Sequence, residues 1–173
     1  MTAKHRMKHL LLLTIFGSPV ASAGTYVGLA TTLIQIKTDT GSTSPLMADA
    51  RFGYALDVHK FELAIMSSIR DDDLNQLVTD VPVATSLFYR YNVYPRSSLL
   101  VDFILGYSQI DIKSSYLQVP EFTETFRGVS FGIGFEEALK SIPKLKFRID
   151  LMQLYRGEQL KINSFTVGFR YEF

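Results

Sequence analysis

Residues 127–136 read RGVSFGIGFE, and this stretch carries the pattern that decides the fold. Large apolar residues occupy the odd positions from 129 to 135, and glycine or serine occupies the even positions from 128 to 134. A repeat of two residues is the spacing of a β-strand whose two faces differ. The stretch therefore predicts a strand with one apolar face and one face of very small side chains.

The same alternation recurs along the rest of the chain. Seven further segments show it: 25–36, 48–58, 61–69, 83–93, 99–107, 144–151 and 165–173. Short connections, at 59–60, around Pro95 and at 137–143, alternate with longer polar ones, at 37–45, 70–80 and 111–125 and a smaller one near 156–157. The pattern predicts an all-β fold, an eight-stranded antiparallel up-and-down β-barrel with its long loops at one end.

Two environments explain such a barrel. In a soluble periplasmic barrel of the lipocalin kind the apolar residues face inward, whereas in a transmembrane β-barrel they face lipid. The small residues of the polar face favour the membrane, because a narrow interior must leave room for large charged side chains. A register that turned Arg51, Arg90, Arg148 or Arg170 toward mid-bilayer would cost about 2–4 kcal/mol for each residue. We therefore predict a transmembrane barrel, with the soluble binding barrel as an alternative.

One segment breaks the alternation. In residues 25–36, Ile34 and Ile36 fall on the opposite parity from Leu29 and Leu33. A β-bulge, or the emergence of the strand from the membrane, would explain the change.

The N-terminus predicts export. Lys4, Arg6 and Lys8 precede an apolar stretch at 10–16, and the small residues 21–23 follow. This layout is typical of a secretory signal peptide, so we expect residues 1–23 to be cleaved and residues 24–173 to form the barrel. A buried helix is the alternative, since the apolar stretch is too short to span a bilayer. Cleavage would leave 18 − 3 = 15 cationic and 17 acidic residues, a net charge of −2.

The amino-acid composition excludes several kinds of functional site. The chain has no cysteine, which excludes disulfides and thiolate metal sites, and the expected mature part has no basic patch for nucleic acid. The only histidine of the expected mature part, His59, falls in an expected short turn. A serine nucleophile needs a base within reach. We therefore predict no enzymatic activity and no cofactor. The acidic run Asp71, Asp72 and Asp73 is a weak candidate for metal binding, and a plain solvated loop is the preferred interpretation.

Charged residues on the expected inner face predict a salt-bridge network. Buried charges must be paired, so a set of opposite charges inside an eight-stranded barrel would form a plug. The expected members are Arg51, Asp57, Glu62, Arg90, Asp102, Glu136, Lys146, Arg148, Asp150, Arg170 and Glu172. A small gated or narrow pore for ions or small solutes is the alternative, because ionisable groups at membrane depth also mark pathways.

The C-terminal strand resembles the assembly signal of bacterial outer-membrane proteins. That signal has a polar residue, a glycine two positions later, and aromatic residues at the third-last and last positions. Here they fall on Thr166, Gly168, Tyr171 and Phe173. The resemblance implies the barrel-assembly machinery as a partner during biogenesis.

The whole expected mature chain resembles the small outer-membrane β-barrel family of Gram-negative bacteria, the OmpA/OmpX-like, porin-family or opacity-type surface proteins. The resemblance lies in TYVGLA (25–30), FYRYNVYPRSSLLVDFILGYSQID (88–111) and VGFRYEF (167–173). It implies a location in the bacterial outer membrane, with contact to lipid and lipopolysaccharide. The even number of expected strands leaves both termini in the periplasm, and we predict a structural or adhesion-type role. Some barrels of this size are enzymes, but the deacylase kind uses His and Ser near the outer end, opposite the expected place of His59. The chain lacks Trp, which leaves as interfacial candidates Tyr26, Tyr89, Tyr94, Tyr107 and Tyr171.

The connection 111–125 is the main candidate for an external ligand. Ile110, Ile112, Tyr116, Leu117, Val119 and Phe122 make it more apolar than a solvated loop requires. It could continue two strands as a protruding hairpin whose edge binds a partner. Alternatively, these residues pack over the mouth of the barrel.

Overall fold

The computed structural model describes residues 23–74, 77–94, 98–116 and 119–173. The expected signal peptide lies outside these residues except for Ala23, where the first strand begins, and Leu117 also lies outside them. The described residues contain no helix long and apolar enough to cross a bilayer.

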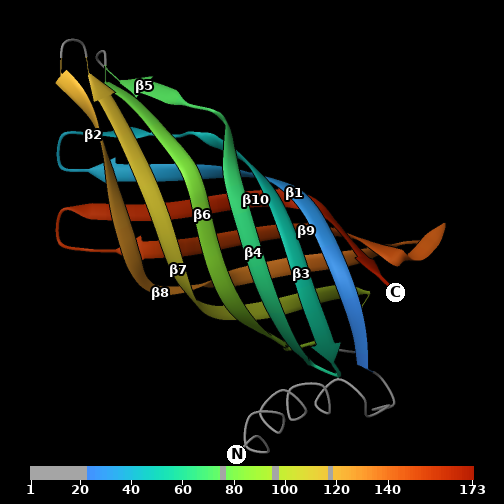
Figure 1. Ribbon diagram of the computed structural model, residues 1–173. Helices are drawn as coiled ribbons and strands as arrows, with labels where there is room; N and C mark the ends of the chain where they lie inside the picture. The colour runs from blue at the N-terminus through green and yellow to red at the C-terminus, as the bar shows by residue number, and fades with distance from the viewer. Residues whose placement is uncertain (1–22, 75–76, 95–97, 117–118) are drawn as a thin grey trace, which may run out of the picture.

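The described residues form ten β-strands. Figure 1 shows how they are arranged. They are β1 (Ala23–Thr38), β2 (Gly41–Thr43), β3 (Leu46–Leu56), β4 (His59–Arg70), β5 (Asp72–Leu74), β6 (Leu77–Asn92), β7 (Leu99–Tyr116), β8 (Val119–Leu139), β9 (Ile142–Arg156) and β10 (Leu160–Glu172). The short strands β2 and β5 pair only with β1 and β6, which leaves eight long strands. These run antiparallel in the order β10-β9-β8-β7-β6-β4-β3-β1, and β10 pairs with β1. The sheet is therefore closed into the predicted eight-stranded barrel.

The two ends of the barrel differ. At one end, called here the turn end, residues 57–58 join β3 to β4, and residues 140–141 join β8 to β9. Ala23 lies there opposite Leu56, and the Phe173 amide donates to the Thr25 carbonyl. At the other end, the loop end, β7 and β8 continue as a long hairpin (Figure 1). In outer-membrane barrels the short turns are periplasmic and the longer loops are external, so the turn end corresponds to the periplasmic end of such a barrel.

The first tight turn differs from the expectation. Leu56 pairs with His59, so the turn consists of Asp57 and Val58 rather than His59 and Lys60. Asp57 has a φ of 54°, a left-handed conformation that Asp tolerates better than most residues. Lys60 therefore lies inside β4, where its side chain is buried.

Of the two explanations for the break in alternation in β1, the bulge was wrong, because no bulge is present in this strand. Residues 26–38 of β1 pair with β10 without a shift in register. Ile34 and Ile36 do not leave the inner face, because the alternation continues through them and both are buried inside the barrel. The inward residues of β1 thus become apolar toward the loop end, because the composition of the barrel interior changes along the barrel axis.

The two faces of the wall confirm the membrane orientation. Outward side chains are large and apolar, with Leu29 71% and Leu87 62% exposed, whereas the inward Arg90 and Arg170 are fully buried. A soluble barrel would have the opposite arrangement. Tyr26 was expected at the membrane interface and is instead buried in the interior, because it shares the inward parity of Gly28.

Candidate functional site

The half of the barrel interior nearest the turn end holds a connected cluster of charges, called here the ionic tier. It combines five cationic side chains with five carboxylates, all buried, so its formal charge is 5 − 5 = 0. The members are Arg51, Lys60, Arg90, Arg148 and Arg170 with Asp49, Glu62, Asp102, Glu136 and Asp150. Neutral balance matters here because an unpaired charge in a low-dielectric interior is very costly.

Arg90 is the centre of this tier. Its guanidinium lies 2.9 Å from Asp102, 2.9 Å from Asp150 and 3.4 Å from Glu62. Glu136 adds a longer contact at 3.8 Å. Four carboxylates from β4, β7, β8 and β9 thus surround one side chain from β6. The contacts with Glu136 and Asp150 connect β6 to strands that are not its neighbours in the wall.

Sequence reasoning placed most but not all members of this tier. Asp57 was expected inside, but it lies exposed in the β3–β4 turn and has no ion pair within the described residues. Lys146 and Glu172 pair with each other at 3.0 Å at the edge of the tier and are only partly buried. Lys60 was missed because the position of the tight turn was wrong by two residues. Asp49 was missed although its parity with Arg51 indicates an inward side chain.

Tyr26 is an uncharged residue that contacts both an acidic and a basic member of the ionic tier. Its hydroxyl donates to Glu62 at 2.9 Å, and the guanidinium of Arg170 lies 4.3 Å from the centre of its ring. The Nε and Nη1 atoms of Arg170 have no hydrogen-bond acceptor among the described residues. The ring of Tyr26 gives one face of this guanidinium a cation–π contact. The residue therefore orients both a carboxylate and a cation.

Glycine makes the close packing of this tier possible. A Cβ atom at Gly134 would lie 2.2 Å from Arg90 Nη2 and 2.4 Å from Asp150 Oδ1. A Cβ atom at Gly53 would lie 2.1 Å from the ring of Tyr26. The small residues of the inner face thus leave the space that the large side chains fill, as the sequence pattern predicts.

The half of the interior nearest the loop end is apolar and is called here the apolar tier. Among the described side chains, its buried members come from every long strand but β8: Ile34, Ile36, Met47, Ala64, Met66, Val81, Ala84, Phe88, Ile104, Ile110, Ile112, Met152, Leu154 and Ile162. Sequence reasoning assigned apolar residues to the lipid face and missed this tier. The signal was present in Ile34 and Ile36, which lie on the polar parity of β1.

Two contacts connect the tiers. The guanidinium of Arg51 lies 5.6 Å from the centre of the Phe88 ring. Buried serines also form a chain, with 2.7 Å between Ser86 Oγ and Ser108 Oγ and 2.7 Å between Ser108 Oγ and Ser130 Oγ. Side chains therefore pack across the lumen where the two tiers meet.

The weak metal and catalytic candidates lie outside the interior. The Asp72 carboxylate accepts a hydrogen bond from the Ser44 amide at 2.6 Å, and Asp71 and Asp73 are exposed. The described part of the chain contains no group of three or more His, Asp or Glu residues that could hold a metal ion. His59 Nδ1 lies 2.7 Å from the Tyr89 hydroxyl, and its ring stacks on Tyr89 at the turn end.

The connection 111–125 is mostly β-structure. β7 and β8 pair from Leu99 opposite Glu137 to Tyr116 opposite Val119, so the expected hairpin is observed. Its sides are held by polar contacts, such as the 2.6 Å ion pair between Lys113 and Glu121. The hydrogen bond to Glu121 raises the pKa of Lys113 in this extramembrane hairpin above its usual value.

The apolar residues of this hairpin divide between the two expected arrangements. Ile110 and Ile112 are buried in the apolar tier, whereas the Phe122 side chain is 52% exposed. Phe122 nevertheless lies on the same face of the hairpin as Ile112, and both line a hollow of ≈ 160 Å³ at the mouth of the barrel.

The four residues of the C-terminal signal occupy both faces of β10. Thr166 is buried and lies 2.8 Å from the Thr32 hydroxyl, and Gly168 faces inward against Ala30. Tyr171 and Phe173 face outward with ring centres 5.5 Å apart, and Phe173 is 67% exposed. Phe173 thus contributes little to the packing of the barrel itself.

Comparisons with solved structures agree with this architecture. Ail, the attachment invasion locus protein of Yersinia pestis, matches with a TM-score of 0.65 at 11% identity, covering 88% of this chain and 100% of Ail. Neisserial surface protein A matches with a TM-score of 0.68 at 11% identity and the same coverage. OprG from Pseudomonas aeruginosa matches with a TM-score of 0.58 at 14% identity, covering 88% of this chain and 96% of OprG. At these identities the likeness concerns the fold.

The family comparison rests on sequence. No curated protein matches the chain. The model of the outer membrane protein beta-barrel domain matches residues 9–173, nearly the whole chain. With its closed barrel, lipid-facing apolar wall and buried salt-bridge network, the chain belongs to the outer membrane protein beta-barrel domain family.

Proposed function

We propose that this protein is a non-conducting, non-enzymatic surface protein of the bacterial outer membrane with a structural or adhesion-type role. The observation that carries the proposal is the filled interior. The ionic tier joins strands across the lumen, and the apolar tier continues the packing to the loop end. An eight-stranded barrel is only wide enough for such side chains to fill it.

Planar-bilayer recording of the purified protein tests this proposal against a narrow pore. We expect no single-channel steps, with a general porin reconstituted in the same lipid as the positive control. Reproducible steps from the pure protein, absent from protein denatured before reconstitution, would show that the tiers form a gated path instead of a plug.

The arrangement of His59 supports a non-enzymatic role. The imidazole lies at the turn end, stacked on Tyr89, and not among the buried serines 86, 108 and 130. A serine nucleophile needs a base within hydrogen-bond reach. Incubation of the purified barrel with lipid A, followed by mass spectrometry of the lipid, would reveal any loss or gain of acyl chains. We expect none.

The β7–β8 hairpin is the proposed contact with external ligands. Its exposed Phe122 lies beyond the apolar tier, and Lys113 and Glu121 stiffen it with an ion pair. Ail, which has the same fold, has been solved with the heparin analogue sucrose octasulfate. Replacing residues 114–123 with a short turn should reduce adhesion to host cells or serum survival and leave the folded barrel intact. Unchanged behaviour would exclude the hairpin.

The proposal also covers the export and assembly of the barrel. A signal peptide over residues 1–23 would direct export, and the mass of the mature protein should correspond to a start at Gly24. The barrel-assembly machinery would then recognise the C-terminal strand. The exposed positions of Tyr171 and Phe173 support this role, because their side chains are free to contact another protein.

A further inference from the structure

Three exposed cationic residues lie side by side on the outer surface at the loop end. Lys37 on β1 pairs with Lys161 on β10, and Lys161 pairs with Arg156 on β9. Directly opposed residues on neighbouring strands have Cβ atoms about 5 Å apart. The three side chains, called here the cation row, therefore form one continuous patch across three strands.

A β-bulge puts Arg156 into this row. Gln153 pairs with Asn163 and Tyr155 pairs with Ile162, so Leu154 is an extra residue in β9. Leu154 is buried in the apolar tier, and Tyr155 also packs against that tier. Two successive residues thus face inward, and Arg156 faces outward. Without the bulge the alternation of the strand would turn Arg156 into the barrel mouth.

The cation row is not balanced by the protein. Like charges directly opposite each other on paired strands are destabilising, and here two such pairs are adjacent. The ion pairs of the described residues include none of the three side chains. The neighbouring carboxylates of Asp39 and Glu158 line a hollow at the barrel mouth. An external anion would compensate the unfavourable arrangement.

The surface below the cation row changes in the order expected at a membrane interface. One row closer to the turn end, the paired outward residues are the amides Gln35, Asn163 and Gln153. In the next outward row they are apolar and 37–45% exposed: Leu33, Phe165 and Leu151. Charge, amide and hydrocarbon therefore follow one another along the same three strands. Long cationic side chains at such a boundary reach the headgroup level of the lipid.

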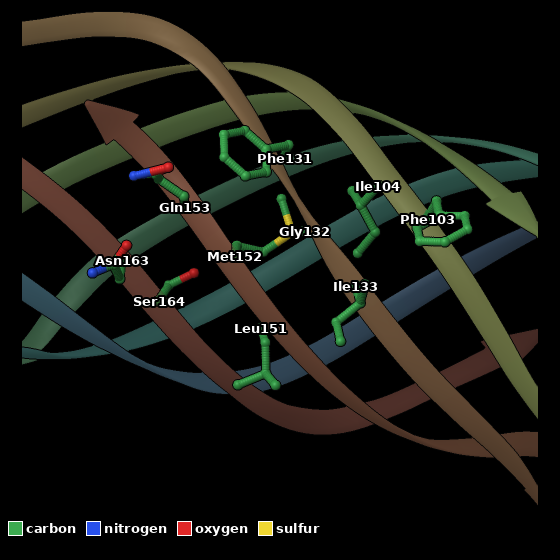
Figure 2. A pocket seen from close by; sticks show the side chains of 10 residues that line it. All are labelled: Phe103, Ile104, Phe131, Gly132, Ile133, Leu151, Met152, Gln153, Asn163 and Ser164. Carbon is green, nitrogen blue, oxygen red and sulfur yellow. The ribbon is translucent and has the colours of Figure 1, made fainter. Parts of the chain in front are cut away.

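An apolar hollow adjoins the amide row (Figure 2). It has a volume of ≈ 580 Å³, and the exposed side chains of Phe103, Phe131 and Leu151 line it, so it opens on the outer face of the wall. Gln153 and Asn163 lie at one side of the hollow.

We propose that the cation row binds the phosphate of a phosphorylated, acylated lipid in the outer leaflet, and that the hollow at Gly132 receives one of its acyl chains. Lipid A, the anchor of lipopolysaccharide, has this chemistry. The inference rests on the outer-membrane location, since the outward face must meet lipid. It assigns a specific site on one side of the barrel, formed by β7, β8, β9, β10 and β1.

Binding of lipid A to the purified barrel in detergent micelles, measured by native mass spectrometry, tests the site. The test variant is K37Q/R156Q/K161Q. The control R70Q/R127Q/K140Q removes three exposed cations that lie outside the cation row and form no ion pair among the described residues. Each cation near an anionic lipid surface contributes roughly a fivefold change in affinity, so the test variant should bind at least about tenfold more weakly. The control should bind like the wild type, and dephosphorylated lipid A should not distinguish the three proteins.

Each of the following outcomes would contradict the proposed lipid site. Equal affinity of the test variant and the wild type excludes the row, and equal losses in both variants show a general charge effect. A wild type that does not prefer phosphorylated lipid excludes the phosphate. A folded barrel changes its mobility on gels when it is heated, so this shift shows whether each variant has folded. If the triple variant does not fold, the double variant K37Q/K161Q replaces it in the binding measurement. Failure of the wild-type protein to fractionate with outer membranes would contradict its location, not this site alone.

Discussion

Arg90 on β6 binds Asp150 on β9 through two parallel hydrogen bonds across the lumen, at 2.9 Å from Nη2 and 3.1 Å from Nη1. Two strands, β7 and β8, separate β6 from β9 in the wall. The fork of a guanidinium matches the two oxygens of a carboxylate and fixes both distance and angle. This pair therefore holds opposite sides of the barrel in one geometry.

Replacing Arg90 with Met should strongly destabilise the barrel. The substitution keeps the volume but leaves buried carboxylates without their central cation, and removal of one partner from a buried ion pair costs about 3–5 kcal/mol. Because the chain has no Trp, far-UV circular dichroism during urea unfolding in micelles is the suitable measurement. Lys113→Met is the control, since it breaks an exposed pair and should leave the unfolding midpoint unchanged. Equal midpoints for the two variants would contradict a stabilising ionic tier.

Gly134→Ala should destabilise the protein more than Gly28→Ala. The new methyl group at position 134 would collide with Arg90 and Asp150, which hold each other and cannot both move aside. Overpacking of this kind costs about 1–3 kcal/mol. At Gly28 the nearest atom is 3.4 Å away, an ordinary contact, and a change within about 0.5 kcal/mol is expected. The same unfolding experiment compares the two, and a larger loss at position 28 would be inconsistent with the packing described above.

The neighbouring residues Leu87 and Phe88 test the two faces of one strand. Phe88→Ala leaves a cavity in the apolar tier and should cost about 3–5 kcal/mol. Leu87 is 62% exposed toward lipid, and acyl chains or detergent can fill the space that Leu87→Ala leaves. Its cost should be less than half as large. The reverse order would indicate that the wall is inverted.

Phe173→Ala should separate assembly in cells from folding in vitro. If the assembly machinery binds the terminal aromatic residue, the amount of barrel in the outer membrane should fall severalfold. Refolding of the purified variant in detergent should be unchanged, because Phe173 is 67% exposed. Phe169→Ala is the matched control, as Phe169 also faces outward from β10 and is not part of the signal. Equal outer-membrane levels for both variants would count against recognition of Phe173.

Much of the fold was predictable because alternation is a local property. The closing strand, residues 165–173, and the hairpin between β7 and β8 both follow from residue types two positions apart. The errors arose where a local signal did not define a boundary. A shift of the β3–β4 turn by two residues moved Lys60 into the interior and Asp57 out of it. The same limit applied to β1, where an apolar residue on the inward parity resembled a bulge.

The sequence alone determined that strands alternate, that small and charged residues share one face, and that this face must be turned away from lipid. Those conclusions need only the repeat of a strand and the high cost of charge in hydrocarbon. The tertiary structure decided which buried groups meet, because Arg90 and Asp150 depend on the register of every strand between them. It also decided that the interior has two tiers and that a bulge at Leu154 turns Arg156 outward beside Lys161. These features depend on closure of the barrel, which sets the pairing of each strand only when all eight strands are present.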